Sequence, residues 1–293
     1  FAVPRIWDKF QEKILEKMPQ KRLSMLLHTP IIGNIVRKKI VKKLGLADAR
    51  YMASGAAPIA VSTLKWFEKL GVTIHQAYGM TEDCILSHYN VPGFNKVGTV
   101  GRAVPGVTPK LSPEGEICIK SDVLMKGYFK SPEQTAEMFD EDGNLKTGDL
   151  GEYDHDGYLT ITGRVKDQFK TDKGKYISPA PIELELLKNI DIEQVCLVGM
   201  GIPQPIALVI TSPLTKNTPR EVLSESLLNS IANVNPSLPK HEKIEKVVVM
   251  KEDWSVENGL LTPTLKVKRN QVEKIHMPMY KSWFQESDKV IYE

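Results

Sequence analysis

A strand–helix–strand rhythm between residues 50 and 77 restricts the possible folds of this chain more than any other feature. The segment Arg50–Ala53 predicts a short buried strand, and Pro58–Leu70 predicts a helix with proline in its first turn. Gly71 ends that helix, and Val72–Ala77 predicts a second strand. Two strands joined by a helix favour a parallel pair in an α/β sheet, because the crossover returns the chain in the same direction.

Residues 91–163 have a different texture, in which short β-rich runs alternate with turn dipeptides. Asp156-Gly157 stands between two such runs and predicts a β-hairpin. One helix is expected over Pro132–Phe139, with Ser131 as its N-cap. We therefore expect a small β-barrel or an antiparallel sheet in this region.

After Gly163-Arg164 the helical and strand patterns alternate again to the end of the chain. Helices are expected over Pro181–Asn189, Pro219–Asn233 and about 266–276, and strands over Val195–Met200, Ile206–Thr211 and Val247–Met250. The predicted fold class is thus α/β with α+β, in three parts. Residues 1–90 hold the βαβ segment and basic helices, residues 91–163 the β-barrel, and residues 164–293 a separate small α+β domain.

The first 45 residues are strongly basic, with eleven Lys or Arg against three acidic residues. Apolar residues recur every four positions after Pro4 and predict a first helix: Ile6, Phe10, Ile14 and Met18. A second basic helix is expected over about 31–44. Such a segment suits an anionic lipid surface or, more commonly, a solvated helix face. Nucleic acid is not an expected partner, because the net charge is only +3 and no nucleic-acid-binding signature is present.

The composition is that of an ordinary globular protein, with 41% hydrophobic and 26% charged residues. No apolar run reaches the ~18 residues that a membrane-spanning helix needs. Cys84, Cys118 and Cys196 lie far apart, which disfavours a disulfide framework or a zinc site and favours a reducing compartment. We expect no secretory leader and a cytoplasmic location, with peripheral membrane contact through residues 1–45 left open.

Three polar segments carry candidate chemistry, whereas GxGxxG, Walker A and HExxH motifs are absent from the sequence. Tyr78–Glu82 follows the second strand at its carboxyl end, where open α/β sheets bind ligands. Asp149 and Arg164 can bind the hydroxyls of a ribose and a nearby phosphate. Leu261–Lys266 ends in a lysine. Each also has a plain structural interpretation, as a strand exit, a turn residue, or a helix start with an exposed lysine.

Taken in order, these segments resemble the adenylate-forming superfamily of acyl-CoA synthetases, aryl-CoA ligases, luciferases and peptide-synthetase adenylation domains. Further segments match the family's adenine-side loop and barrel motif: Ser54–Pro58, and Gly115–Ile119 with Gly127-Tyr128. Val3–Lys9 and Leu261–Lys266 look most like the long-chain acyl-CoA synthetases. The resemblance extends over about residues 50–270.

The resemblance implies a two-step reaction that uses ATP, Mg²⁺ and CoA. A fatty acid attacks ATP to give acyl-AMP and pyrophosphate, and the CoA thiol then displaces AMP. The residues implied at the adenine are Tyr78, which stacks on the ring, and Gly55, Ala56, Ala57 and Gly79 beside it.

For the rest of the nucleotide, the resemblance implies Thr81 at the α-phosphate and Glu82 as the magnesium ligand, both counted as catalytic. Asp149 matches the acid that binds the ribose hydroxyls, and Arg164 matches an adjacent sugar contact. Lys266 matches the catalytic lysine, whose ammonium would bridge the α-phosphate and the attacking carboxylate.

The segment after residue 163 is implied to move. Lys166 matches the hinge between the large and small domains of the family, and Lys170–Lys175 matches the loop that serves the CoA step. Lys173 stands where the family usually has glycine, so Gly174 is the remaining position for a close approach of CoA.

The family's Ser/Thr/Gly-rich loop for the pyrophosphate end of ATP has no counterpart before Ser54. We therefore expect this chain to be the C-terminal portion of a longer synthetase, with the missing N-terminal half as its partner, and to be inactive alone. Two other functions stay open. One is an adenylate-forming ligase for aryl or amino acids, and the other is a non-catalytic nucleotide-binding or membrane-binding module.

Overall fold

The computed structural model describes residues 1–215 and 218–293. The chain forms two compact units, Phe1–Ile161 and Thr162–Glu293, and each is described by itself. The expected division into three parts, with an inner boundary near residue 90, stays a prediction.

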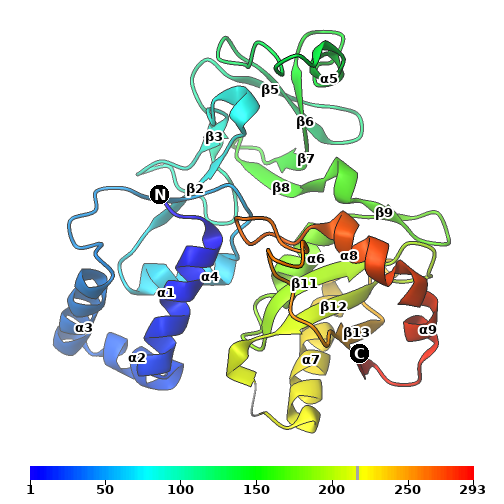
Figure 1. The fold of residues 1–293 in the computed structure, drawn as a ribbon. Helices are drawn as coiled ribbons and strands as arrows, with labels where there is room; N and C mark the ends of the chain where they lie inside the picture. The colour runs from blue at the N-terminus through cyan, green and yellow to red at the C-terminus, as the bar shows by residue number, and fades with distance from the viewer. Residues whose placement is uncertain (216–217) are drawn as a thin grey trace. The chain divides into compact units, whose positions relative to one another are not determined.

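The elements of the first unit, with β8 running across its end, are α1 (Pro4–Lys17), α2 (Gln20–His28), α3 (Pro30–Lys43), β1 (Met52–Ser54), α4 (Val61–Lys69), β2 (Ile74–Tyr78), the 3-10 helix η1 (Thr81–Asp83), β3 (His88–Tyr89), β4 (Arg102–Ala103), β5 (Thr108–Leu111), β6 (Glu116–Lys120), α5 (Pro132–Glu137), β7 (Leu145–Tyr153) and β8 (Leu159–Arg164) (Figure 1). The second unit holds η2 (Val165–Asp167), β9 (Phe169–Lys170), β10 (Tyr176–Ile177), α6 (Pro179–Leu186), β11 (Ile192–Val198), β12 (Ile206–Thr211), η3 (Pro213–Thr215), α7 (Arg220–Val234), η4 (Asn235–Ser237), β13 (Lys246–Val249), α8 (Arg269–His276), η5 (Met277–Met279), α9 (Tyr280–Gln285) and β14 (Val290–Tyr292).

The predicted strand–helix–strand unit is confirmed as β1–α4–β2. The two strands are parallel, with Met52 opposite Ile74 and Ser54 opposite Gln76, and the sheet continues antiparallel through β3 and β4. The helix begins at Val61, three residues later than predicted. The difference arises because Ala60 is extended, at a φ of −64° and a ψ of 135°, and the preceding Ile59 is buried in the core.

The core of α1–α4 gathers aromatic and leucine side chains, among them Trp7 and Phe67, whose rings meet edge to face at 5.3 Å. The predicted stripe on α1 was wrong at one position, since Ile6 is 43% exposed and Trp7 takes its place in the core. Helix α2 was not predicted at all. Pro19 immediately precedes α2 and Pro30 begins α3, positions where a missing N–H costs nothing.

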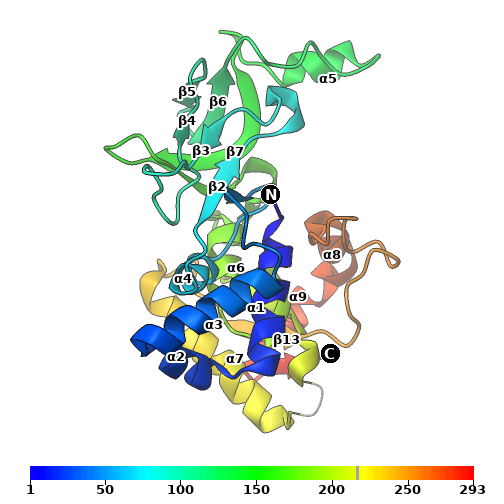
Figure 2. The same cartoon turned by 90° about the vertical axis from the view of Figure 1, so that its left-hand side faces the viewer.

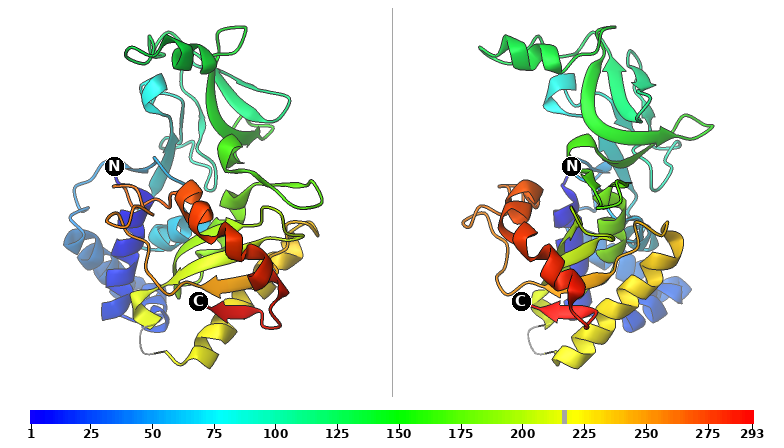
Figure 3. Two further views of the ribbon diagram at one scale, coloured as in Figure 1. Left: turned by 45° about the vertical axis from the view of Figure 1, so that its right-hand side comes forward. Right: turned by 90° about the vertical axis from the view of Figure 1, so that its right-hand side faces the viewer.

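Strands β5–β8 form the expected antiparallel sheet, which curls as half of a barrel (Figure 3). Ile117, Ile119 and Leu159 fill its concave core, because alternate residues of each strand point to one face. The predicted hairpin joins β7 to β8, with Gly157 at a φ of 79° donating to Asp154 O at 3.0 Å. Ser131 precedes α5 as expected, but its side chain makes no capping hydrogen bond.

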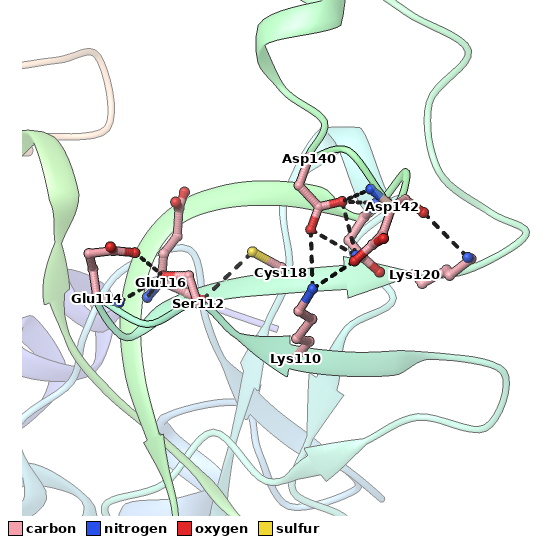
Figure 4. A network of polar contacts seen from close by, with 9 residues as sticks. Lys110, Ser112, Glu114, Glu116, Cys118, Lys120, Asp140 and Asp142 are labelled. Carbon is pink, nitrogen blue, oxygen red and sulfur yellow. Dashed lines mark hydrogen bonds and ion pairs between the residues drawn. The ribbon is translucent and has the colours of Figure 1, made fainter.

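A polar network stabilises the outer edge of this sheet (Figure 4). Lys110 Nζ lies 2.9 Å from Asp142 Oδ2 and 3.7 Å from Asp140 Oδ2, so one cation joins β5 to the turn before β7. Farther along, the Ser112 hydroxyl accepts a hydrogen bond from Glu116 N at 3.1 Å. These contacts are exposed and contribute little free energy each, but they define the turn geometry.

The second unit is a four-stranded sheet of order β11–β12–β13–β14 with helices on both faces (Figure 3). One face packs on α6 and α7 through alternate residues such as Leu197 and Val209. The other packs on α8 and α9 through the intervening residues, such as Val198 and Leu208. This confirms a separate α+β unit. Helix α9 and strand β14 were not predicted.

No helix in the described ranges, 1–215 and 218–293, is both long and apolar enough to cross a bilayer.

Candidate functional site

Two loops meet at one edge of the first sheet, because β1 and β2 are parallel and end side by side. Gly55–Ala57 follows β1, and Gly79 follows β2. A Cβ on Gly55 would lie 2.8 Å from Ala77 O, so only glycine allows the loops to approach this closely. Ala56 adopts a left-handed φ of 65°, a strained conformation for a residue with a side chain. The backbone at this sheet edge therefore depends on a close approach that only glycine permits and on a strained alanine.

Tyr78 connects this edge to the half-barrel. Its hydroxyl donates to Asp149 Oδ2 at 2.9 Å. Burial and the neighbouring Asp149 carboxylate raise the pKa of Tyr78 far above its usual range. The phenol therefore stays protonated and acts as a donor, while its ring packs against the core of the half-barrel. The structure brings these sequence-predicted residues together.

A bulge in β7 places Asp149. Glu116 pairs with Leu150 and Cys118 with Lys146, so residues 147–149 of β7 stand opposite Ile117 alone, and the β7 side holds two extra residues. Gly148 occupies a φ of 73°, and its N–H donates to the Glu116 carboxylate at 2.9 Å. The Glu116 side chain, shown in Figure 4, thereby holds the turn that carries Asp149.

The turn after β2 is compact around η1. Asp83 is fully buried, and its Oδ1 accepts the Met80 N–H at 2.8 Å. Burial raises the pKa of Asp83. A Cβ on Gly79 would lie 2.7 Å from the backbone of Ile85, so glycine is required there as well. In this turn Thr81 is exposed and Glu82 is half-buried.

Glu82 has a partner that the sequence could not reveal. The Tyr128 hydroxyl donates to Glu82 Oε1 at 2.7 Å, and Met125 N donates to Glu82 O at 2.7 Å. The hydrogen bond with the Glu82 carboxylate raises the pKa of Tyr128. Tyr128 was identified only as part of the barrel motif. Its role as an orienting group for Glu82 depends on the loop that follows β6.

His88 is a second residue that sequence reasoning missed. It is fully buried, with Nδ1 2.7 Å from Ser87 Oγ and Nε2 2.8 Å from the Tyr153 hydroxyl. Burial lowers the pKa of His88 to about 4. The neutral ring therefore links β3 to β7 beneath Tyr78, whose ring lies 6.2 Å away.

Lys266 lies in a tight turn of the second unit and not at a helix start, since α8 begins only at Arg269. Lys266 N donates to the Thr262 hydroxyl at 3.0 Å, and Thr262 N donates to Lys266 O at 2.8 Å. Leu265, at a φ of 61°, closes the turn. The expected helix over 266–276 was therefore wrong in its first turn, because these local bonds bend the chain back.

Arg269 anchors the end of this turn. Its guanidinium forms an ion pair with Glu183 of α6 and also donates to Leu197 O. The same Glu183 carboxylate accepts Leu197 N at 2.6 Å. Both side chains are nearly buried, with 12% and 16% of their surfaces exposed. The end of the lysine turn is thus attached to α6 by a largely desolvated ion pair and to β11 by the hydrogen bond with Leu197 O.

The remaining sequence-predicted residues also lie in the second unit. Gly174, at a φ of 74°, stands in the hairpin between β9 and β10 and donates to Thr171 O at 3.0 Å. Lys166 is exposed within η2, and Arg164 ends β8. Within the two described ranges, no three His, Cys, Asp or Glu side chains form a group that could hold a metal ion.

Two family models match this chain. The AMP-binding enzyme model matches residues 1–129, and the AMP-binding enzyme C-terminal domain model matches residues 166–284. The chain belongs to the adenylate-forming superfamily of AMP-binding enzymes, as its motifs indicated. ATP and AMP are the nucleotides of this family.

The chain is 31% identical to long-chain-fatty-acid–CoA ligase 5 of Rattus norvegicus, over 97% of this chain and 48% of that protein. The chain spans about half the length of the curated relatives it matches.

Two solved structures show the same fold. The adenylation domain of a carboxylate reductase from Mycobacterium chelonae has a TM-score of 0.75 at 23% identity, covering 97% of this chain and 46% of that one. An ATP-bound RpMatB-BxBclM chimera has a TM-score of 0.67 at 27% identity, covering 92% of this chain and 54% of that one. The expected α/β and α+β fold class is confirmed.

Proposed function

We propose that this chain carries the nucleotide-binding and lysine-bearing parts of a fatty acid–CoA ligase. The observation that carries the proposal is the Tyr78–Asp149 contact, which places an aromatic ring and a carboxylate at one sheet edge. Similarity to a long-chain-fatty-acid–CoA ligase supports the choice of substrate class.

The site residues divide by the part of ATP that they suit. The Tyr78 ring suits stacking on a planar adenine, and the small residues Gly55–Ala57 and Gly79 suit a close approach of the backbone to that ring. Asp149 suits the two hydroxyls of the ribose, since a carboxylate accepts both at once. A bound ribose would share this carboxylate with the Tyr78 hydroxyl.

Thr81 and Glu82 suit the phosphates. A hydroxyl donates to a phosphate oxygen, and a carboxylate oriented by Tyr128 suits Mg²⁺, which binds through one or two carboxylates together with phosphate oxygens and water. Bound Mg²⁺ would neutralise charge on the departing pyrophosphate. Glu82 is the residue of this chain that would hold it.

Lys266 would act in the first step. The fatty acid carboxylate forms a bond to the α-phosphorus, the bond to the bridging oxygen breaks, and pyrophosphate leaves. An ammonium near both anions reduces their repulsion. In the second step the CoA thiolate attacks the acyl carbon and AMP leaves. Gly174 would allow CoA to approach, Lys166 would be the hinge, and Arg164 a sugar contact, as the family resemblance implies.

A second candidate is activation of another carboxylic acid. The similarity to a carboxylate reductase adenylation domain favours it, because the reaction up to the acyl-adenylate is chemically the same. The two candidates differ in the acyl group that they accept and not in the nucleotide site.

The test is calorimetric titration of the chain with AMP and with non-hydrolysable acyl-adenylates that carry fatty or aryl groups. We expect AMP to bind, and fatty acyl-adenylates to bind more tightly than aryl ones. Activity is then measured in a chimera that places the amino-terminal half of the rat ligase before residue 1. Lys266→Ala should slow acyl-AMP formation but not thioester formation from supplied acyl-AMP, and Lys274→Ala on α8 is the control. Failure of AMP to bind either form would overturn the proposal.

A further inference from the structure

The hairpin of α2 and α3 carries positive charge without any negative charge. Residues 20–43 contain seven Lys or Arg and no Asp or Glu. Arg37 is used inside the hairpin, where its guanidinium donates to Leu27 O at 3.0 Å and Lys69 O at 2.9 Å. The other six cations are exposed: Lys21, Arg22, Lys38, Lys39, Lys42 and Lys43.

The same hairpin exposes large apolar side chains. Ile31 is 77% exposed, Ile35 is 61% exposed and Met25 of α2 is 69% exposed. These side chains are not part of the core. Helix α3 packs on the core through its opposite side, where Val36 and Ile40 lie. Because these isoleucines are exposed to water, they contribute no hydrophobic stabilisation to the fold.

Apolar and positively charged side chains lie on the same face of α3. Residues four, seven and eleven positions apart share a helix face, so Ile31, Ile35, Lys38 and Lys42 form a single outer stripe. The first half of the stripe is apolar and the second half is cationic. Figure 2 shows α2 and α3 connected by a short turn, at the helical end of the first unit.

The hairpin is rigid enough to present this stripe. A Cβ on the buried Gly33 would lie 2.7 Å from Leu27 O, so the two helices touch through their backbones. The Arg37 bonds cross from α3 to both α2 and the end of α4. The stripe is therefore a preformed surface that needs no folding step before it binds.

We propose that this stripe, Ile31, Ile35, Lys38 and Lys42 with the flanking cations, docks on an anionic lipid surface. Isoleucines reach the acyl boundary of a bilayer while lysines remain at the level of the phosphates. Nucleic acid fits less well, because residues 20–43 contain no Phe, Tyr or Trp side chain on which a base could stack. The inference does not depend on the proposed ligase activity, although a fatty acid substrate would be concentrated at such a surface.

The experiment is flotation of the chain with vesicles of phosphatidylcholine alone or with added phosphatidylserine, at low and high salt. Binding is expected only to the anionic vesicles and should weaken with salt. Lys38→Gln/Lys42→Gln should weaken binding about 25-fold, at about fivefold for each charge. Ile31→Asn/Ile35→Asn should weaken it at least tenfold, because two inserted apolar groups are lost.

Matched variants in the second unit remove the same number of charges or isoleucines from exposed positions. Lys274→Gln/Lys281→Gln and Ile190→Asn/Ile275→Asn should bind as the unaltered chain does. Equal binding by all variants, or equal binding to neutral vesicles, would overturn the proposal. So would self-association that the Ile31/Ile35 change abolishes without any vesicle binding, or binding of RNA that excludes the vesicles.

Discussion

The Tyr78 hydroxyl donates a hydrogen bond of 2.9 Å to Asp149 Oδ2, and this bond joins the parallel βαβ sheet to the curled antiparallel sheet. The two residues are 71 positions apart, and each stands at the end of a separate local motif. Because the acceptor is a carboxylate, this hydrogen bond is stronger than one between two neutral groups.

Asp149→Ala should lower the affinity for AMP at least tenfold while the fold survives. Each charge-assisted ribose contact is worth about 1.5–3 kcal/mol, and the variant removes a pair of them. Calorimetric titration measures the affinity. Asp156→Ala is the control, since that acid lies in the exposed hairpin after β7. Unchanged AMP binding in a stable Asp149 variant would contradict the assignment.

Tyr128→Phe should weaken the Mg²⁺ dependence of ATP binding by about threefold to tenfold. Without the phenol, the Glu82 carboxylate loses the donor that orients it, at a cost of about 1 kcal/mol. The first measurement is the affinity for ATP at a series of magnesium concentrations. The second is the titration of the tyrosines, in which the variant should lack one tyrosine whose pKa is raised. Tyr176→Phe, at an exposed position, should change neither quantity. An unchanged magnesium midpoint would show that Tyr128 does not orient Glu82.

Gly79→Ala should displace the turn that carries Thr81 and Glu82. Its Cβ would lie 2.7 Å from the Ile85 backbone, which cannot move aside as a flexible side chain would. We expect a loss of about 1–3 kcal/mol in the unfolding free energy and a clear loss of nucleotide affinity. Gly71→Ala is the control, because a Cβ there meets nothing within 4 Å and only the left-handed φ is strained. Urea unfolding and AMP titration separate the two effects.

Arg269→Met should destabilise the second unit by about 3–5 kcal/mol, because it leaves the Glu183 carboxylate nearly buried without its cation. Lys188→Met breaks an ion pair with Glu185 that is exposed, and it should cost about 1 kcal/mol or less. Urea unfolding measures both. The double variant Arg269→Met/Glu183→Leu should recover much of the loss. If Arg269→Met is as mild as Lys188→Met, the pair does not anchor the lysine turn.

His88 should make stability fall in mild acid. The pKa of the buried imidazole is about 4, against an ordinary value of 6.5, so between these pH values the unfolded chain binds more protons than the folded chain. The part of the unfolding free energy that depends on neutral His88 is fully present above pH 6.5. It is lost as the pH falls toward 4, by about 3 kcal/mol. His88→Gln should flatten this part of the curve of unfolding free energy against pH. His155→Gln, at an exposed position, should leave the slope unchanged.

Local patterns accounted for elements whose side chains alternate or repeat within a few residues. The βαβ segment, the Asp156-Gly157 hairpin and the strand over Ile206–Thr211 follow from periodicity and turn chemistry. Helix α2 did not follow, because Pro19 and Pro30 have the same local signature at a helix start as at a break. The first turn of the expected 266–276 helix failed because hydroxyl contacts of Thr262 replaced helical bonds.

The amino-acid sequence by itself determined the superfamily and the order of the motifs, because each motif is contiguous and its chemistry is local. Only the tertiary structure decided which groups hold those residues. Tyr128 meets Glu82 across 46 positions, Tyr153 meets His88 across 65, and Arg269 meets Glu183 across 86. Such partners leave no periodic trace in the chain, since their spacing is set by how the sheets and helices pack.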